Sequence, residues 1–179
     1  MIKLKGNELS RITADEYKKI KKIPLIIVLD NIRSALNVGS VFRTSDAFLV
    51  EKIILCGITA KPPHKEIRKT ALGSNLSVNW EYEENTVNII TKLKTKGYYI
   101  VGVEQTKKST LLNNFKIKKK PIAIIMGNEI EGVSEEALKK CDEIVEIPQF
   151  GIKNSLNISV ATGIIAWEIH KKLLINIVK

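Results

Sequence analysis

Cysteine is scarce in this sequence, and no apolar run is long enough to cross a membrane. The two cysteines, Cys56 and Cys141, lie far apart with no cluster of further ligand residues beside them, so neither a disulfide framework nor a metal site is indicated. The N-terminus, MIKLKGNELS, lacks the apolar region of a signal peptide, and a membrane span would need about 20 apolar residues. These absences predict a soluble cytoplasmic protein that binds neither a metal nor a membrane.

Two familiar nucleotide-binding motifs are also missing. No GxGxxG pattern occurs, so an ordinary dinucleotide site is not supported. Residues 127–134, GNEIEGVS, have the spacing of a phosphate-binding loop, but Val133 stands where that loop requires lysine. Without this cation the pattern indicates only a glycine-bounded turn.

Positive charge, in contrast, is plentiful. The chain carries 29 Lys and Arg against 19 Asp and Glu, a net charge of +10, which favours a polyanionic partner; a solvated basic surface with no partner is the alternative. His64 is a candidate general base, but a loop histidine among lysines more often contacts solvent or phosphate. The predicted phosphate contacts lie in a proline-rich loop at 58–69 and in a basic segment at 107–120: Lys61, His64, Lys65, Arg68, Lys69, Lys107 and Lys108.

Strand and helix patterns alternate along the 179 residues, enough for one domain with a sizeable core. Strands are predicted at 25–29, 52–56, 78–82, 98–103, 122–126 and 143–148, those at 25–29 and 122–126 being of the buried type. Helices are predicted at 13–21, 38–48, 85–93 and 156–174, and a short helix is predicted to follow Ser134. This order predicts an α/β fold with a mainly parallel sheet and helices on both faces. Residues 1–22 are predicted to be a basic N-terminal extension with a short helix, and residues 23–175 the main domain.

The strands at 122–126 and 143–148 both end in loops rich in Gly, Asn, Ser and Glu. Ligands of open α/β sheets bind at the carboxyl ends of strands, so we expect a site here. Helix caps are predicted at Asn37, Ser134 and Ser155, each at the exit of such a loop.

Three motifs follow one another in the chain: NVGSVFRTSDAF at 37–48, IIMGNEIEGVS at 124–134 and IPQFGIKNSLNISVATG at 147–163. Together they resemble the SpoU/TrmH family of RNA 2′-O-ribose methyltransferases, of the SPOUT class, over about residues 24–170. The resemblance implies a C-terminal trefoil knot that forms an S-adenosylmethionine pocket, a homodimer, and methyl transfer to a ribose hydroxyl. The chain departs from the family pattern at Leu49, where a glycine is frequent.

The resemblance also implies roles for individual residues. The catalytic set is Arg43, Asn37, Glu129, Ser155 and Asn157. The cofactor-binding set is Glu104, Met126, Gly127, Ile147 and Leu156. No metal ligand is implied.

Arg43 is expected to hold the RNA phosphate and ribose and to stabilise the developing alkoxide. A guanidinium stays charged in proteins, so the phosphate or water would accept the proton. Transfer RNA is favoured over ribosomal RNA as substrate, because no added RNA-binding domain is visible. Two alternatives stay open: a catalytically silent, cofactor-binding RNA module, and an unrelated α/β enzyme acting on a small molecule.

The helix predicted at 156–174 is apolar almost all round. This pattern fits a helix that the sheet covers on one side and a second subunit on the other, with Trp167 in the interface. A fully internal core helix is the alternative.

Overall fold

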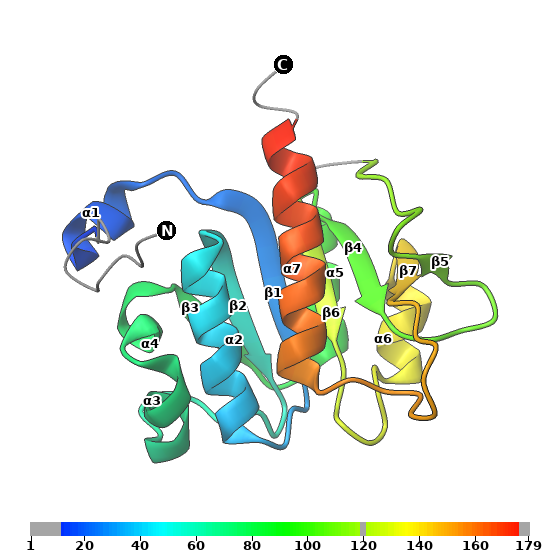
Figure 1. The fold of residues 1–179 in the computed structure, drawn as a ribbon, viewed down its shortest axis with the longest axis horizontal. Coiled ribbons are helices and arrows are strands. Elements are labelled where there is room, and N and C mark those ends of the chain that lie inside the picture. The colour runs from blue at the N-terminus through cyan, green and yellow to red at the C-terminus, as the bar shows by residue number, and fades with distance from the viewer. Residues whose placement is uncertain (1–11, 119–120, 176–179) are drawn as a thin grey trace, which may run out of the picture.

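The protein forms one seven-stranded sheet with helices on both faces, in a computed structural model that describes residues 12–118 and 121–175 (Figure 1). The strand order is β3-β2-β1-β6-β4-β7-β5, and every neighbouring pair is parallel. The strands are β1 Ile23–Asp30, β2 Val50–Cys56, β3 Trp80–Glu83, β4 Tyr99–Val103, β5 Thr110–Leu111, β6 Ile122–Met126 and β7 Glu143–Glu146. The helices are α1 Ala14–Lys19, α2 Ala35–Ala47, α3 Lys65–Ala71, α4 Ser74–Ser77, α5 Thr86–Thr95, α6 Glu135–Lys140 and α7 Ile158–Ile175. The predicted fold class is confirmed, and the sheet is parallel throughout; the trefoil knot stays a prediction.

Two layers of buried side chains cover the two faces of the sheet. Helices α2 and α7 pack against each other on one face of the sheet (Figure 1). Phe42 of α2 and Ile165 of α7 are buried there. Helices α5 and α6 lie on the other face, where Ile90 and Ala137 are buried. The central strands β1 and β6 are buried almost completely, as a parallel sheet covered on both sides requires.

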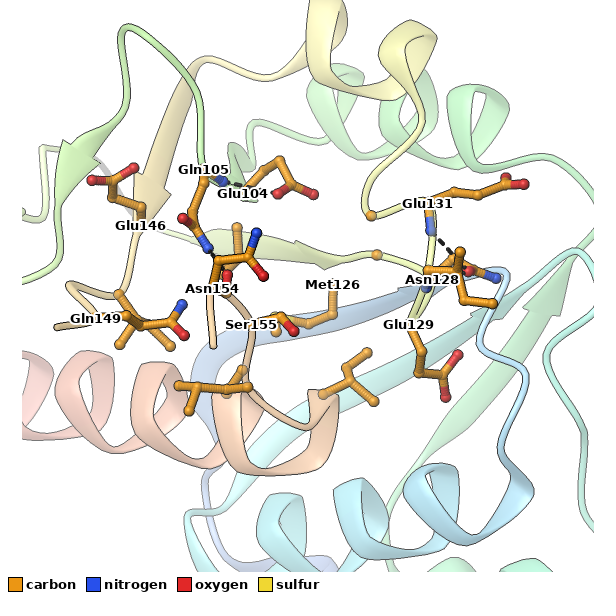
Figure 2. A pocket seen from close by; sticks show the side chains of 18 residues that line it. Glu104, Gln105, Met126, Asn128, Glu129, Glu131, Glu146, Gln149, Asn154 and Ser155 are labelled. Carbon is orange, nitrogen blue, oxygen red and sulfur yellow. Dashed lines mark hydrogen bonds between the residues drawn. The ribbon is translucent and has the colours of Figure 1, made fainter. Parts of the chain in front are cut away.

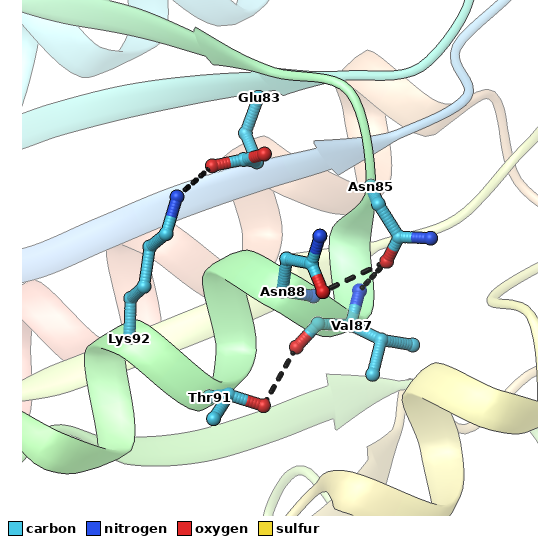
Figure 3. A network of polar contacts seen from close by, with 6 residues as sticks. All are labelled: Glu83, Asn85, Val87, Asn88, Thr91 and Lys92. Carbon is cyan, nitrogen blue, oxygen red and sulfur yellow. Dashed lines mark hydrogen bonds and ion pairs between the residues drawn. The ribbon is translucent and has the colours of Figure 1, made fainter.

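Helix α5 shows how one helix is fixed to the sheet (Figure 3). The Asn85 side chain accepts hydrogen bonds from the backbone N–H groups of Val87 and Asn88, at 2.8 and 3.1 Å, and so caps the helix. One turn from the far end, Lys92 forms an ion pair with Glu83 at the end of β3. The cap defines the start of α5, and the ion pair holds the helix beside the carboxyl end of the edge strand β3.

Two predicted helix caps are wrong, by three residues in α2 and by two residues in α7. Helix α2 begins after Ser34, whose hydroxyl accepts a hydrogen bond from the Asn37 backbone N–H, so Asn37 lies inside the helix. Helix α7 begins after Asn157, whose side-chain oxygen accepts from the backbone N–H of Ser159 and Val160, so Ser155 lies before the cap. In both places two cap-forming residues stand two or three positions apart, and sequence alone does not choose between them.

The third predicted cap, Ser134, is at the correct position but makes no side-chain capping bond. Its hydroxyl and its backbone N–H are both 3.2 Å from the buried Asp30 carboxylate, which also accepts from Thr86. Asp30, at the end of β1, thereby joins the starts of α5 and α6. These bonds satisfy a carboxylate that is almost fully buried.

The two basic segments predicted as loops contain regular structure. Helix α3 takes up the end of the first segment, and its N-cap is His64, whose Nδ1 accepts from the Glu66 backbone N–H at 3.2 Å. The second segment contains β5 and buries Leu112 and Phe115, which anchor this part of the segment to the core.

Near the N-terminus, Thr13 and Glu16 form a capping box that starts α1, in the region where a short helix was predicted. Residues 1–11 of the predicted extension lie outside the described part of the chain. Leu49, where the family often has glycine, adopts a left-handed φ of 53°, the conformation that glycine accepts without strain.

Candidate functional site

A cavity of about 430 Å³ opens at the carboxyl edge of the sheet, between the loops that follow β4, β6 and β7 (Figure 2). Strand β6 lies between β1 and β4, so its carboxyl end delivers the 127–134 loop to the middle of this edge. The lining residues are Val103, Glu104, Gln105, Met126, Gly127, Asn128, Glu129, Ile130, Glu131, Gly132, Glu146, Ile147, Gln149, Asn154, Ser155, Leu156, Ile158 and Ala161. All five predicted cofactor residues are among them, as are Glu129 and Ser155 of the predicted catalytic set.

The 127–134 loop closes on itself to form one wall of the cavity. Asn128 and Gly132 exchange two backbone hydrogen bonds of 2.9 Å. A Cβ on Gly127 would lie 2.1 Å from the Gly132 carbonyl carbon, so only glycine fits there. Gly132 has a φ of 70°, and its Cα lies against the Glu104 carboxylate, which accepts a hydrogen bond of 3.0 Å from the Val133 backbone N–H.

Three predicted catalytic residues from three different motifs form one hydrogen-bonded network. The Asn37 side-chain amide donates to Glu129 at 2.9 Å, and the Asn157 amide donates to the Asn37 side-chain oxygen at 3.0 Å. Glu129 also accepts from the backbone N–H groups of Arg33 and Ser34, at 2.9 and 3.1 Å. The network ties the 127–134 loop and the start of α7 to the first turn of α2.

The surroundings of Glu129 favour its anionic form. Partial burial raises the pKa of its carboxyl, but the hydrogen bonds from the Arg33 backbone, the Asn37 amide and the Ser34 backbone outweigh burial and leave the pKa below its ordinary value. The start of helix α2 also favours a negative charge at this position. Glu129 is therefore a weak base that orients its neighbours.

The cavity combines an apolar wall with a strongly acidic one. Met126, Ile147 and Leu156 supply apolar side chains. The charged lining residues are all glutamates, Glu104, Glu129, Glu131 and Glu146, and none of them forms an ion pair within the described part of the chain. In a chain of net charge +10, this is a local surplus of negative charge that favours a cationic ligand.

Arg43 lies apart from the residues that line this cavity. It is exposed on α2 and borders a second hollow, of about 490 Å³, between α2 and α3. The hollow is also lined by Lys69, Thr70 and the ring of Phe48. Within one chain, the predicted catalytic arginine therefore does not line the cavity that the predicted cofactor residues form.

The predicted phosphate contacts all lie at the surface. Lys65, Arg68 and Lys69 project from α3, and Lys107 and Lys108 lie in the segment after β4; all five are exposed. The Lys61 ammonium is placed over the Tyr82 ring, 3.8 Å from its centroid. His64 is exposed, and its ring forms the cap of α3 described above.

Sequence reasoning missed several residues that shape the cavity. The Gln105 amide donates to the Asn154 carbonyl at 2.6 Å and joins the segments after β4 and β7 (Figure 2). The Asn128 amide donates to the Asn31 carbonyl at 2.7 Å and fixes the 127–134 loop to the end of β1. Both residues come just after a buried strand, and this position could have indicated from the sequence that they lie at the ligand-binding edge of the sheet.

Among the residues described, no group of three metal-ligating side chains occurs, and no helix is long and apolar enough to cross a membrane.

The fold and the cavity define a parallel α/β protein with a ligand site at the carboxyl edge of its sheet. The model of the SpoU rRNA Methylase family matches residues 24–167. The chain belongs to this family.

Individual relatives agree with this assignment. The 23S rRNA (guanosine-2′-O-)-methyltransferase RlmB of Blochmanniella floridana is 36% identical over 82% of this chain and 57% of its own length. Among solved structures, the Aquifex aeolicus TrmH/SpoU tRNA modifying enzyme is 28% identical, with a TM-score of 0.81 over 91% of this chain and 83% of that one. An AdoMet-bound rRNA methyltransferase from Sinorhizobium meliloti is 29% identical, with a TM-score of 0.78 over 87% of this chain and 59% of that one.

Proposed function

We propose that this protein is an S-adenosylmethionine-dependent methyltransferase that acts on the 2′-hydroxyl of a ribose in cytoplasmic RNA. The observation that carries the proposal is the convergence of Glu104, Met126, Gly127, Ile147 and Leu156 on one cavity, in a chain of the SpoU family. The AdoMet complex of the Sinorhizobium meliloti relative supports the choice of cofactor.

The cavity fits this cofactor in size and in chemistry. Its volume is in the range of roughly 300–1,000 Å³ that small-molecule sites occupy. Apolar side chains from Met126, Ile147 and Leu156 suit a flat heterocycle. The lining glutamates, which form no ion pair within the described residues, suit a sulfonium cation. When bound, the cofactor would supply an electrophilic methyl group.

The chain's own residues would position and polarise the ribose. Arg43 would bind the RNA phosphate and the attacking oxygen and stabilise the negative charge that develops on it. The RNA phosphate or a water would accept the proton, because guanidinium stays charged and Glu129 is a weak base. Asn37 and Asn157 would hold the loops around the ribose, and Ser155 would contribute a hydroxyl at the cavity wall.

This assignment requires two copies of the chain. Arg43 does not line the cavity of its own chain, so we propose a homodimer in which Arg43 of one subunit completes the site of the other. The exposed apolar face of α7, formed by Val160, Ile164 and Trp167 and lying beside α2, supports an interface here. The exposure of this face argues against the fully internal helix.

Transfer RNA is the favoured substrate. The Aquifex aeolicus tRNA modifying enzyme supports this choice, with a TM-score of 0.81 over 91% of this chain, against 0.78 over 87% for the rRNA methyltransferase from Sinorhizobium meliloti. Mass spectrometry of ribose-methylated nucleosides in each RNA class, from a strain that lacks the gene, tests this choice. A mark lost only from ribosomal RNA would reverse it.

A tritium-transfer assay with bulk RNA tests the activity itself. Release of S-adenosylhomocysteine together with labelled RNA supports a methyltransferase. Cofactor binding without transfer would leave the catalytically silent RNA module as the better description.

A further inference from the structure

The loop after β7 exposes two large apolar side chains at its tip. Phe150 is 96% exposed and Ile152 is fully exposed, with Gly151 between them. Of the other three phenylalanines, Phe42 and Phe115 are buried, and Phe48 packs partly buried against the core. Phe150 therefore contributes nothing to the folding of the described chain.

The base of the same loop is well anchored. Gln149, Asn154, Ser155 and Leu156 line the cavity, and Asn154 accepts the hydrogen bond from Gln105. Residues 150–153, in contrast, make no hydrogen bond within the part of the chain that the structure describes. An anchored base with an unsupported apolar tip holds Phe150 next to the mouth of the cavity and leaves its ring free.

The positive charge around the tip favours a partner that carries phosphate groups. Lys153 is exposed on the tip, and Lys107 and Lys108 are exposed on the segment that Gln105 joins to this loop. The cavity below is lined by glutamates, which repel phosphate. An RNA strand whose ribose enters the cavity must therefore carry its phosphates along the outer, lysine-bearing rim, where it meets Phe150.

We propose that residues 150–153 form an RNA-binding element in which Phe150 stacks on an unpaired nucleobase beside the methylated ribose, while Lys153 contacts the adjoining phosphate. An exposed aromatic ring next to cations is the arrangement with which proteins hold single-stranded RNA, because every base offers a flat face for stacking. Ile152 adds apolar contact beside the base. The proposal rests on the RNA methyltransferase function proposed above and assigns part of its substrate recognition to these residues.

Binding to a short oligouridylate and to inorganic polyphosphate tests the assignment. Phe150→Ala should weaken oligouridylate binding by about tenfold and leave polyphosphate binding unchanged, because it removes stacking alone. Phe150→Trp should restore the affinity. Lys153→Gln should weaken both ligands and lower the salt dependence by about one phosphate contact.

In the methylation assay, Phe150→Ala should raise the KM for RNA and leave kcat nearly unchanged. Leu76→Ala is the matched control, since Leu76 is 81% exposed on α4, away from this loop. Calorimetry with S-adenosylmethionine and light scattering should give wild-type values for both variants.

Three results would overturn the assignment. They are unchanged RNA affinity in Phe150→Ala, a loss of cofactor affinity without a loss of RNA affinity, and a change in subunit mass, which would mean that a second copy covers the tip. Failure of the proposed function looks different, because the wild type itself would then bind no S-adenosylmethionine and transfer no methyl group.

Discussion

Four N–H groups donate hydrogen bonds to the side chains of Glu129 and Asn37. These bonds hold the surrounding loops together, and we assign the two side chains a structural role rather than one in proton transfer. The pKa of Glu129 is lowered in the folded chain, so its contribution to stability is present above the ordinary value of 4.5 and is lost as the pH falls through the folded pKa. Glu129→Gln should lower the free energy of unfolding near neutral pH by only about 0.5 kcal/mol, because the side chain is exposed and water screens its interactions.

Thermal unfolding at a series of pH values measures this effect. The gap between wild type and Glu129→Gln should narrow as the solution is acidified below about pH 4.5. Glu131→Gln is the control, because the Glu131 side chain is exposed and makes no hydrogen bond within the described residues. A gap that widens in acid would contradict the assigned role of Glu129.

Arg43 gives a second prediction at the scale of single residues. Arg43→Ala should lower methyl transfer by at least about a hundredfold and leave cofactor affinity unchanged, because Arg43 does not line the cavity. A tritium-transfer assay and calorimetry with S-adenosylmethionine measure the two quantities. Near-normal transfer by this variant would remove Arg43 from the mechanism.

At the scale of elements, the 127–134 loop depends on a glycine at its first position. Gly127→Ala should displace the loop, because its new Cβ would come within 2.1 Å of the Gly132 backbone. We expect cofactor affinity to fall by about tenfold or more, with a smaller loss of thermal stability. Gly151→Ala is the control, since nothing lies within 4 Å of a Cβ placed there. Equal cofactor affinities in the two variants would show that the loop does not shape the cavity.

The elements also show what the sequence can and cannot predict. Strand β6 was predicted to the residue, because five apolar residues stand between Pro121 and Gly127. Helix α3 was missed, since it buries only Ile67 and Ala71, and two prolines precede it. Strand β5 has two residues, too few for a detectable pattern.

The sequence predicted several residues that line the cavity, but it did not predict how they are arranged; their roles stay predictions. Motif positions identified the side chains around the cavity, and their meeting at one sheet edge follows from parallel strands. The separation of Arg43 from that cavity depends on the direction in which one face of α2 points, and the sequence carries no signal for it.

At the scale of the whole molecule, the apolar face of α7 predicts the state of assembly. Trp167 is 51% exposed and packs against the rings of Phe48 and His170, so Trp167→Glu should leave the fold intact and produce monomers with little activity. Light scattering, circular dichroism and the transfer assay measure these three properties.

Leu76→Glu places the same charge on an exposed leucine of α4 and should remain dimeric. A monomer mass for the wild type at tens of micromolar protein would end the dimer proposal. An unfolded Trp167→Glu would assign that side chain to the core.

The order of strands across the sheet affects how the chain folds while the ribosome is still synthesising it. Strand β1 leaves the ribosome early and pairs with β2, but its other neighbour, β6, is made only after β3 and β4. Until then the nascent chain carries an open, almost wholly apolar strand edge, which is prone to pair with other chains. Chains cut off just before Pro121 should therefore aggregate, and chaperones that shield hydrophobic segments should bind them better than the finished protein.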